Sequence, residues 1–96
     1  MTSSGLRAED RLDGRGNWVP WRARIVLLLE ECELWEIVES VVTLPTDPIQ
    51  LAKFKKKNVK AKRIILDSVK NHIIPHMSGR DYAYKMWESL SNLYQI

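Results

Sequence analysis

The sequence contains two histidines and one cysteine, whose side chains could bind a metal or attack a substrate. His72 and His76 are four residues apart, the spacing that places two imidazoles on one face of a helix. Cys32 could supply a thiolate. However, Pro75 should break a helix between the two histidines, and no second cysteine or suitably placed carboxylate completes a ligand set. Because Cys32 also falls on an apolar stripe, where an inert thiol is expected, we predict no metal site and no cofactor.

Other catalytic motifs are missing from the sequence. No serine lies in a G-x-S-x-G context, and Gly14 and Gly16 form only an isolated G-R-G rather than a phosphate-binding loop. The single cysteine allows no intramolecular disulfide. We therefore expect a protein that is not an enzyme and that has no small-molecule substrate.

The composition is that of an ordinary folded domain, with 96 residues, 45% hydrophobic and 28% charged. The longest apolar run, residues 25–29, is far shorter than the ~20 residues of a membrane span. The N-terminal residues lack the apolar segment of a secretory signal. These features predict a soluble, cytoplasmic protein without a membrane partner.

Charge is strongly segregated along the chain, although the net charge is only +3. Residues 53–63 contain seven cations in eleven positions and no acid, whereas residues 30–39 contain five glutamates and no base. The cations could follow the phosphate backbone of RNA, could contact the acidic segment of a second copy, or could only solvate a helix. The basic surface comprises Lys53, Lys55, Lys56, Lys57, Lys60, Lys62 and Arg63. The acidic surface comprises Glu30, Glu31, Glu33, Glu36 and Glu39.

Apolar residues recur at spacings of three and four along most of the chain, which predicts an all-α, compact bundle of four to five helices. Asn17 should cap a first helix, and after a weak break near Glu33 a second short helix should follow from Leu34. It should loosen toward Thr43, because the β-branched Val41, Val42 and Thr43 disfavour a strong helix. Asp47 should cap a third helix that continues to about His72, and Gly79 should provide a turn before a last helix that starts near Asp81. We expect residues 1–16 to be a disordered tail, which Leu12 could anchor to the core, and residues 17–96 to be the folded domain.

Three of the four tryptophans occur within residues 18–35. On helical apolar faces, tryptophans are usually core residues rather than platforms for bases or ligands. We therefore assign them to the core. The predicted core comprises Trp18, Trp21, Ile25, Leu28, Trp35, Phe54, Ala61, Ile65, Val69, Trp87, Leu90 and Tyr94.

Four segments in this order resemble a known family. They read LDGRGNWVPWR, then LWEIV, then FKKKNVKAKRIILDSV, then AYKMWESLSNLY, and the resemblance covers roughly residues 12–96. This pattern is similar to the N-terminal capsid-like region of the Gag polyprotein of copia-type LTR retrotransposons. The matching positions are Leu12, Gly14, Asn17, Trp18, Trp21 and Arg22; Leu34, Trp35 and Val38; Phe54, Ala61, Ile64, Ile65, Ser68 and Val69; and Ala83, Trp87, Leu90 and Tyr94.

The sequence departs from the family pattern at three places. Phe54 stands where the family often has tryptophan, Tyr82 stands where it often has a threonine cap, and one extra residue precedes Asn17. The resemblance implies a structural protein that self-associates into virus-like particles and packages retroelement RNA. It also implies a partial capsid region, because family members usually continue with more capsid helices and a downstream zinc knuckle. The alternatives are an RNA- or single-stranded nucleic-acid-binding module that uses the basic helix 53–63, and a host-adopted protein-interaction domain.

Overall fold

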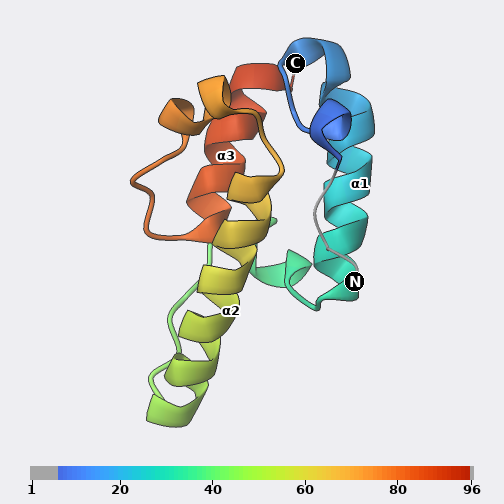
Figure 1. Ribbon diagram of the computed structural model, residues 1–96. Helices are drawn as coiled ribbons and strands as arrows, with labels where there is room; N and C mark the ends of the chain where they lie inside the picture. The colour runs from blue at the N-terminus through green and yellow to red at the C-terminus, as the bar shows by residue number, and fades with distance from the viewer. Residues whose placement is uncertain (1–6, 96) are drawn as a thin grey trace.

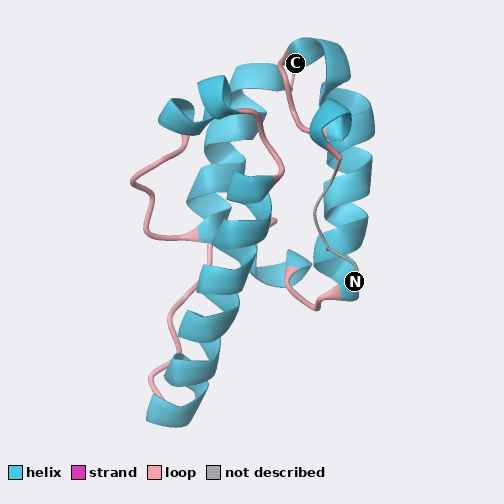
Figure 2. Ribbon diagram, viewed as in Figure 1, coloured by secondary structure: helices cyan, strands magenta, loops and turns pink. Residues whose placement is uncertain are grey.

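The computed structural model describes residues 7–95, which form an all-α fold as predicted (Figures 1 and 2). Within this range there are three α-helices, four short 3-10 helices and no strand. The order is η1 (Ala8–Asp10), η2 (Arg15–Asn17), α1 (Trp18–Glu31), η3 (Trp35–Ile37), α2 (Pro48–Asp67), η4 (Asn71–His76) and α3 (Ala83–Tyr94). None of the described helices is long and apolar enough to cross a membrane.

Helix α1 begins directly after Asn17, as predicted, but the Asn17 side chain does not cap it. Instead, Asn17 Oδ1 accepts a hydrogen bond from the Asp13 amide at 2.9 Å, and Nδ2 donates to the Arg11 carbonyl at 2.8 Å. The asparagine therefore holds the turn that leads into the helix. Pro20 lies in the first helical turn, where its missing N–H costs little.

The C-terminal end of α1 is a Schellman motif built on a glutamate. The Leu34 amide donates to the Leu29 carbonyl at 2.7 Å, and the Glu33 amide donates to the Glu30 carbonyl at 3.0 Å. Leu29 and Leu34 are both buried, which supplies the apolar contact typical of this motif. Glu33 has φ 59°, a left-handed conformation in which glycine is usual.

The second short helix, predicted to follow from Leu34 and to loosen toward Thr43, is shorter than expected. Only the three residues of η3 are helical, and residues 41–45 have no regular structure. The β-branched Val41, Val42 and Thr43 disfavour a helix, as the sequence indicated. Val38 and Ile37 are nevertheless buried, so the segment still contributes to the core.

Helix α2 begins as predicted but ends earlier. Asp47 Oδ2 accepts a hydrogen bond from the Gln50 amide at 3.0 Å, and Pro48 occupies the first helical position. The helix ends at Asp67 rather than near His72. The predicted break at Pro75 is also wrong, because Pro75 lies inside η4.

The end of α2 coincides with a contact to the N-terminal segment. The Leu12 amide donates to the Ser68 carbonyl at 2.9 Å, and the Lys70 amide donates to the Leu12 carbonyl at 3.0 Å. Leu12 is fully buried, and it forms an isolated parallel bridge with Val69. The ordered domain therefore starts before the predicted boundary at residue 17. Residues 1–6 of the predicted tail lie outside the described residues.

The core lies where α1, α2 and α3 meet. Of the predicted core residues, Leu28, Trp35 and Tyr94 are only partly buried and pack against the core, while the others are buried. Leu29, not Leu28, is the fully buried leucine of α1. The buried residues that the sequence prediction omitted are Leu12, Leu29, Leu34, Ile37, Val38, Ile73, Met77, Ala83 and Met86.

Candidate interaction surfaces

The cations of the basic surface lie along α2, whose N-terminal half projects from the rest of the molecule in Figure 1. Lys53, Lys56, Lys60 and Arg63 are spaced three, four and three residues apart, so they form a stripe along one side of the helix. We call these four residues the basic stripe. At 1.5 Å per residue the stripe is about 15 Å long. It faces away from the buried side of α2, on which Phe54, Ala61 and Ile65 lie.

The positive charge of this surface is almost entirely unpaired within residues 7–95. Arg63 Nε lies 3.4 Å from Asp67 Oδ2, but none of the six lysines forms an ion pair. Lys62 is half-buried, and the other five lysines are exposed. The projecting helix therefore presents an uncompensated positive charge to its surroundings.

The glutamates of the acidic surface gather at the C-terminal end of α1 and around η3. Glu30 and Glu31 lie in the last turn of α1, Glu33 is the left-handed residue that follows, and Glu36 lies in η3. All five glutamates are exposed, and none forms an ion pair with another residue that the structure describes. Carboxylates at this end of a helix add to the negative end of its dipole. The acidic surface is thus also uncompensated, and the fold does not pair it with the basic surface.

The tryptophans form one aromatic cluster between α1 and α3. Trp21 stacks on Trp87 with ring centroids 5.6 Å apart, and Trp35 meets Trp87 edge-on at 5.2 Å. Trp18 lies 5.4 Å from Trp21 and 5.9 Å from Tyr94. Trp18, Trp21 and Trp87 are at most 5% exposed. The indoles therefore join two helices instead of forming an open stacking platform.

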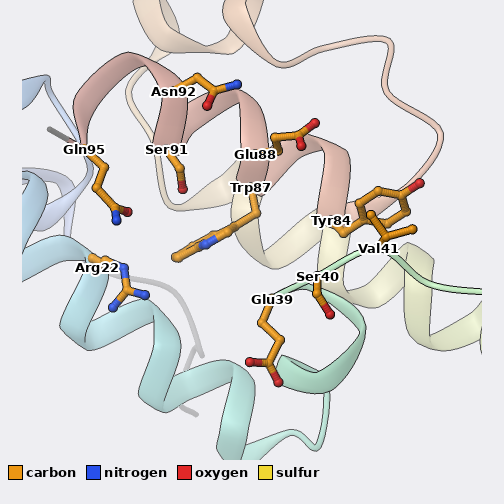
Figure 3. Close-up of a pocket in the computed structure, with 10 residues that line it drawn as sticks. All are labelled: Arg22, Glu39, Ser40, Val41, Tyr84, Trp87, Glu88, Ser91, Asn92 and Gln95. Carbon is orange, nitrogen blue, oxygen red and sulfur yellow. The ribbon is translucent and has the colours of Figure 1, made fainter.

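A groove of about 580 Å³ opens beside this cluster (Figure 3). On one side the Arg22 guanidinium lies 6.0 Å from the Trp35 ring centroid and 5.9 Å from that of Trp87. Glu39 and Glu88 bring two carboxylates to the lining, so its charges are mixed. The remaining lining residues are Ser40, Val41, Tyr84, Ser91, Asn92 and Gln95. No hydrogen bond joins a nucleophile to a base among these residues, and we assign the groove no chemistry.

The histidines and the cysteine are not brought together. His72 and His76 both lie in η4 and are exposed, and Cys32 is half-buried at the end of α1. His72 Nε2 lies 2.8 Å from the Asp13 carbonyl oxygen and 3.3 Å from Asp13 Oδ1. Since a carbonyl only accepts, Nε2 is the donor, and His72 holds the N-terminal segment.

The family of the chain follows from comparison with known proteins. A family model described as the gag-polypeptide of LTR copia-type matches residues 25–96, three quarters of the chain. The chain belongs to the copia-type Gag family. The family is a structural one, not a family of enzymes. Comparisons with curated proteins and with solved structures gave no match.

Two polar residues of this Gag domain that sequence reasoning did not assign a role connect its helices. Asn58, on the buried side of α2, donates from Nδ2 to the Asp81 carbonyl and accepts from the Ala83 amide at Oδ1, both at 2.9 Å. It therefore caps α3 from another helix, where Tyr82 provides no side-chain cap. The sequence does contain a hint of this role. Asn58 is an uncharged residue within a run of lysines, and its spacing of four residues from Phe54 and three from Ala61 places it on the buried side of the helix.

Ser68 is the second connecting residue. Its carbonyl oxygen accepts from the Leu12 amide and from Trp21 Nε1, the latter at 2.8 Å. Its hydroxyl donates to the Ile65 carbonyl at 2.7 Å. One buried peptide group thus ties the N-terminal segment, α1 and the end of α2 together. Ser68 is far from Leu12 and Trp21 in the sequence, so no local sequence pattern predicts these hydrogen bonds.

Proposed function

We propose that this Gag domain is a capsid-type building block that self-associates into particles around retroelement RNA. The observation that carries the proposal is the pair of oppositely charged surfaces, on α2 and around η3, which are not neutralised within the described chain. Family membership supports a Gag-type structural role. The charges supply a physical means of association between copies.

The arrangement of the two surfaces favours a head-to-tail contact. The basic stripe of one copy meets the acidic surface of the next, so that each pair of copies keeps one free basic surface and one free acidic surface. Such heterologous contacts generate rings when the rotation closes and open arrays when it does not. Exposed charges are screened beyond about 8 Å at physiological ionic strength, so association should weaken as salt is added.

The experiment is sedimentation velocity over a wide concentration range at low and high salt. One variant carries Lys53→Glu, Lys56→Glu and Lys60→Glu. The matched control carries the same charge change at three exposed cations elsewhere, Arg7→Glu, Arg11→Glu and Lys85→Glu. The wild-type protein and the control should grow in size with concentration at low salt, and the α2 variant should lose this salt-sensitive growth. Equal growth of the α2 variant and the wild type would refute a role for the basic stripe in assembly.

A reciprocal variant strengthens the test. Glu30→Lys, Glu31→Lys and Glu36→Lys reverse the acidic surface, so this variant alone should also lose the salt-sensitive growth. Mixed with the α2 variant, it should form mixed complexes, because an acidic α2 then meets a basic η3 region. A mixture that stays monomeric while the wild type assembles would show that the two surfaces are not partners.

A second candidate function is RNA binding through the basic stripe, which the unpaired lysines along about 15 Å of exposed helix favour. RNA binding by fluorescence anisotropy should then weaken steeply with salt, with a logarithmic slope of about −0.7 for each phosphate contacted on a single strand. The α2 variant should bind RNA more weakly and show a smaller slope, and the control variant should not. Binding that is insensitive to the α2 variant would exclude the basic stripe as the RNA site.

A further inference from the structure

Helix α1 carries apolar side chains on its outer side as well as on the side that contacts the core. Val19, Ala23 and Leu27 are spaced four residues apart and are exposed; Val19 is 76% and Leu27 60% exposed. We call these three residues the α1 outer stripe. The opposite side of the same helix carries the buried Trp18, Trp21, Ile25 and Leu29. A helix that is apolar on both sides is usually buried on both sides.

The α1 outer stripe lies on the edge of the molecule. In Figure 1, α1 forms one flank, and α2 and α3 lie together on its other side. The stripe is about 12 Å long, because Val19 and Leu27 are eight positions apart and each position adds 1.5 Å along the helix. Ala23 at its centre has the smallest side chain of the three, so a second helix could approach closely there and pack between Val19 and Leu27.

The charges along α1 indicate that the partner is a second copy of the same helix and that the two helices are antiparallel. Arg15 lies just before the N-terminal end of the helix, which is also the positive end of the dipole, whereas Glu30 and Glu31 lie at the negative end. An antiparallel copy of the same helix brings each acidic end to the opposite basic end, and a parallel copy would align like charges. Two cations flank Ala23 in the sequence: Arg24 lies 4.0 Å from Asp10, and the Arg22 guanidinium lies over the rings of Trp35 and Trp87.

We propose that the α1 outer stripe is a two-fold contact between two copies of this chain, with antiparallel α1 helices that cross at Ala23. The inference rests on the proposed function, because in both cases the partner is a second copy, but its apolar contact is the α1 outer stripe, and it shares only Glu30 and Glu31 with the acidic surface. The contact is self-complementary, so it closes on two copies. One helix pair buries less than the ~1,600 Å² of a standard interface, so the contact is weak and forms at high local concentration.

The first test is cross-linking at Ala23. Ala23→Cys and Val59→Cys are each made in a Cys32→Ser background and treated with a short bismaleimide, because packed helix axes lie about 8–10 Å apart, too far for most disulfides. Val59 is the matched control, since it is 63% exposed and lies on α2. We expect about tenfold more covalent dimer from Ala23→Cys, which corresponds to a preference of about 1.4 kcal/mol. Equal yields from the two variants would overturn the proposal.

The second test adds Leu27→Lys to the Ala23→Cys protein, with Val59→Lys as its control. Both changes place a lysine at an exposed position of a helix, so both proteins should fold, which far-UV circular dichroism checks. Leu27→Lys should reduce the cross-linked yield to the level of random collision, and Val59→Lys should leave it unchanged. If Leu27→Lys has no effect on the yield, the antiparallel contact is refuted.

The two proposals fail separately. Lys53→Glu, Lys56→Glu and Lys60→Glu should abolish salt-sensitive growth but leave cross-linking at Ala23→Cys intact. Growth that persists without preferential cross-linking would refute the α1 contact alone. If Ala23→Cys cross-links preferentially but the charge-reversal variants grow in size as the wild type does, the head-to-tail contact alone is refuted.

Discussion

Replacing Glu33 by glycine should stabilise the fold. Glu33 has φ 59° at the position of the Schellman motif that glycine usually occupies. A left-handed conformation costs an L-residue about 1–2 kcal/mol, and glycine avoids this cost. Glycine in turn adds freedom to the unfolded chain, which offsets about 0.4–1 kcal/mol of the gain. We therefore expect the backbone contribution of Glu33→Gly to raise the free energy of unfolding by about 0.5–1 kcal/mol.

The charge of Glu33 needs its own control, because Glu30 and Glu31 lie close by at the negative end of α1. Removing one carboxylate there relieves repulsion worth roughly 0.3–1 kcal/mol. Glu33→Gln removes the same charge but keeps a side chain in the left-handed conformation. The difference in stability between Glu33→Gly and Glu33→Gln therefore isolates the backbone term.

Urea denaturation and thermal melting measure these differences. For a domain of this size 1 kcal/mol corresponds to a Tm shift of about 4–8 °C. Glu33→Gly should melt above Glu33→Gln by a few degrees, and the denaturant m-value should not change. If the glycine variant is no more stable than the glutamine variant, the strain assigned to Glu33 is not present in solution.

Three further changes test contacts that hold the domain together. Leu12→Ala should lower the free energy of unfolding by about 2–5 kcal/mol in urea denaturation, because it empties a fully buried site; a change below 1 kcal/mol would place Leu12 outside the fold. Asn58→Ala should cost about 1–2 kcal/mol through loss of the α3 cap, whereas the exposed Asn92→Ala should stay within about 0.5 kcal/mol. Trp21→Phe removes the only side-chain donor to the Ser68 carbonyl among the described residues and should cost at least about 1 kcal/mol in thermal melting; an unchanged Tm would show that this bond contributes nothing.

The sequence predicted the elements that local signals determine. Spacings of three and four among apolar residues placed α1, α2 and α3, and Asp47 marked the start of α2 through a cap that the structure contains. Gly79, with φ 82°, marked the turn before α3. The all-α class and the family resemblance could be predicted because both rest on patterns within short stretches of consecutive residues.

The errors occurred where distant residues decide the structure. Helix α2 ends at Asp67, where the carbonyl of the next residue, Ser68, accepts a hydrogen bond from Leu12, and a local pattern does not reveal this pairing. No glycine marks the Schellman turn at Glu33, so the sequence indicated only a weak break there, and the apolar spacing after it predicted more helix than the three residues of η3. Leu28 and Leu29 are adjacent in an apolar run, and a rotation of one residue decides which of them is buried.

The charged surfaces illustrate a different limit. Sequence composition located both the basic and the acidic segments, but it could not show that the fold leaves them unpaired. The α1 outer stripe was not predicted at all, because an exposed Val19 or Leu27 has the same residue type as a core position. Only its exposure in the folded chain distinguishes it.

All four tryptophans lie in one cluster, so the intrinsic fluorescence of the protein reports on that cluster. Their rings lie close enough together to exchange excitation energy, so their fluorescence behaves as one signal from the junction of α1, η3 and α3. Helix α2 contains no tryptophan, so unwinding of its projecting half would not change that emission. Fluorescence and helical circular dichroism should therefore separate the opening of the aromatic junction from the melting of the basic helix.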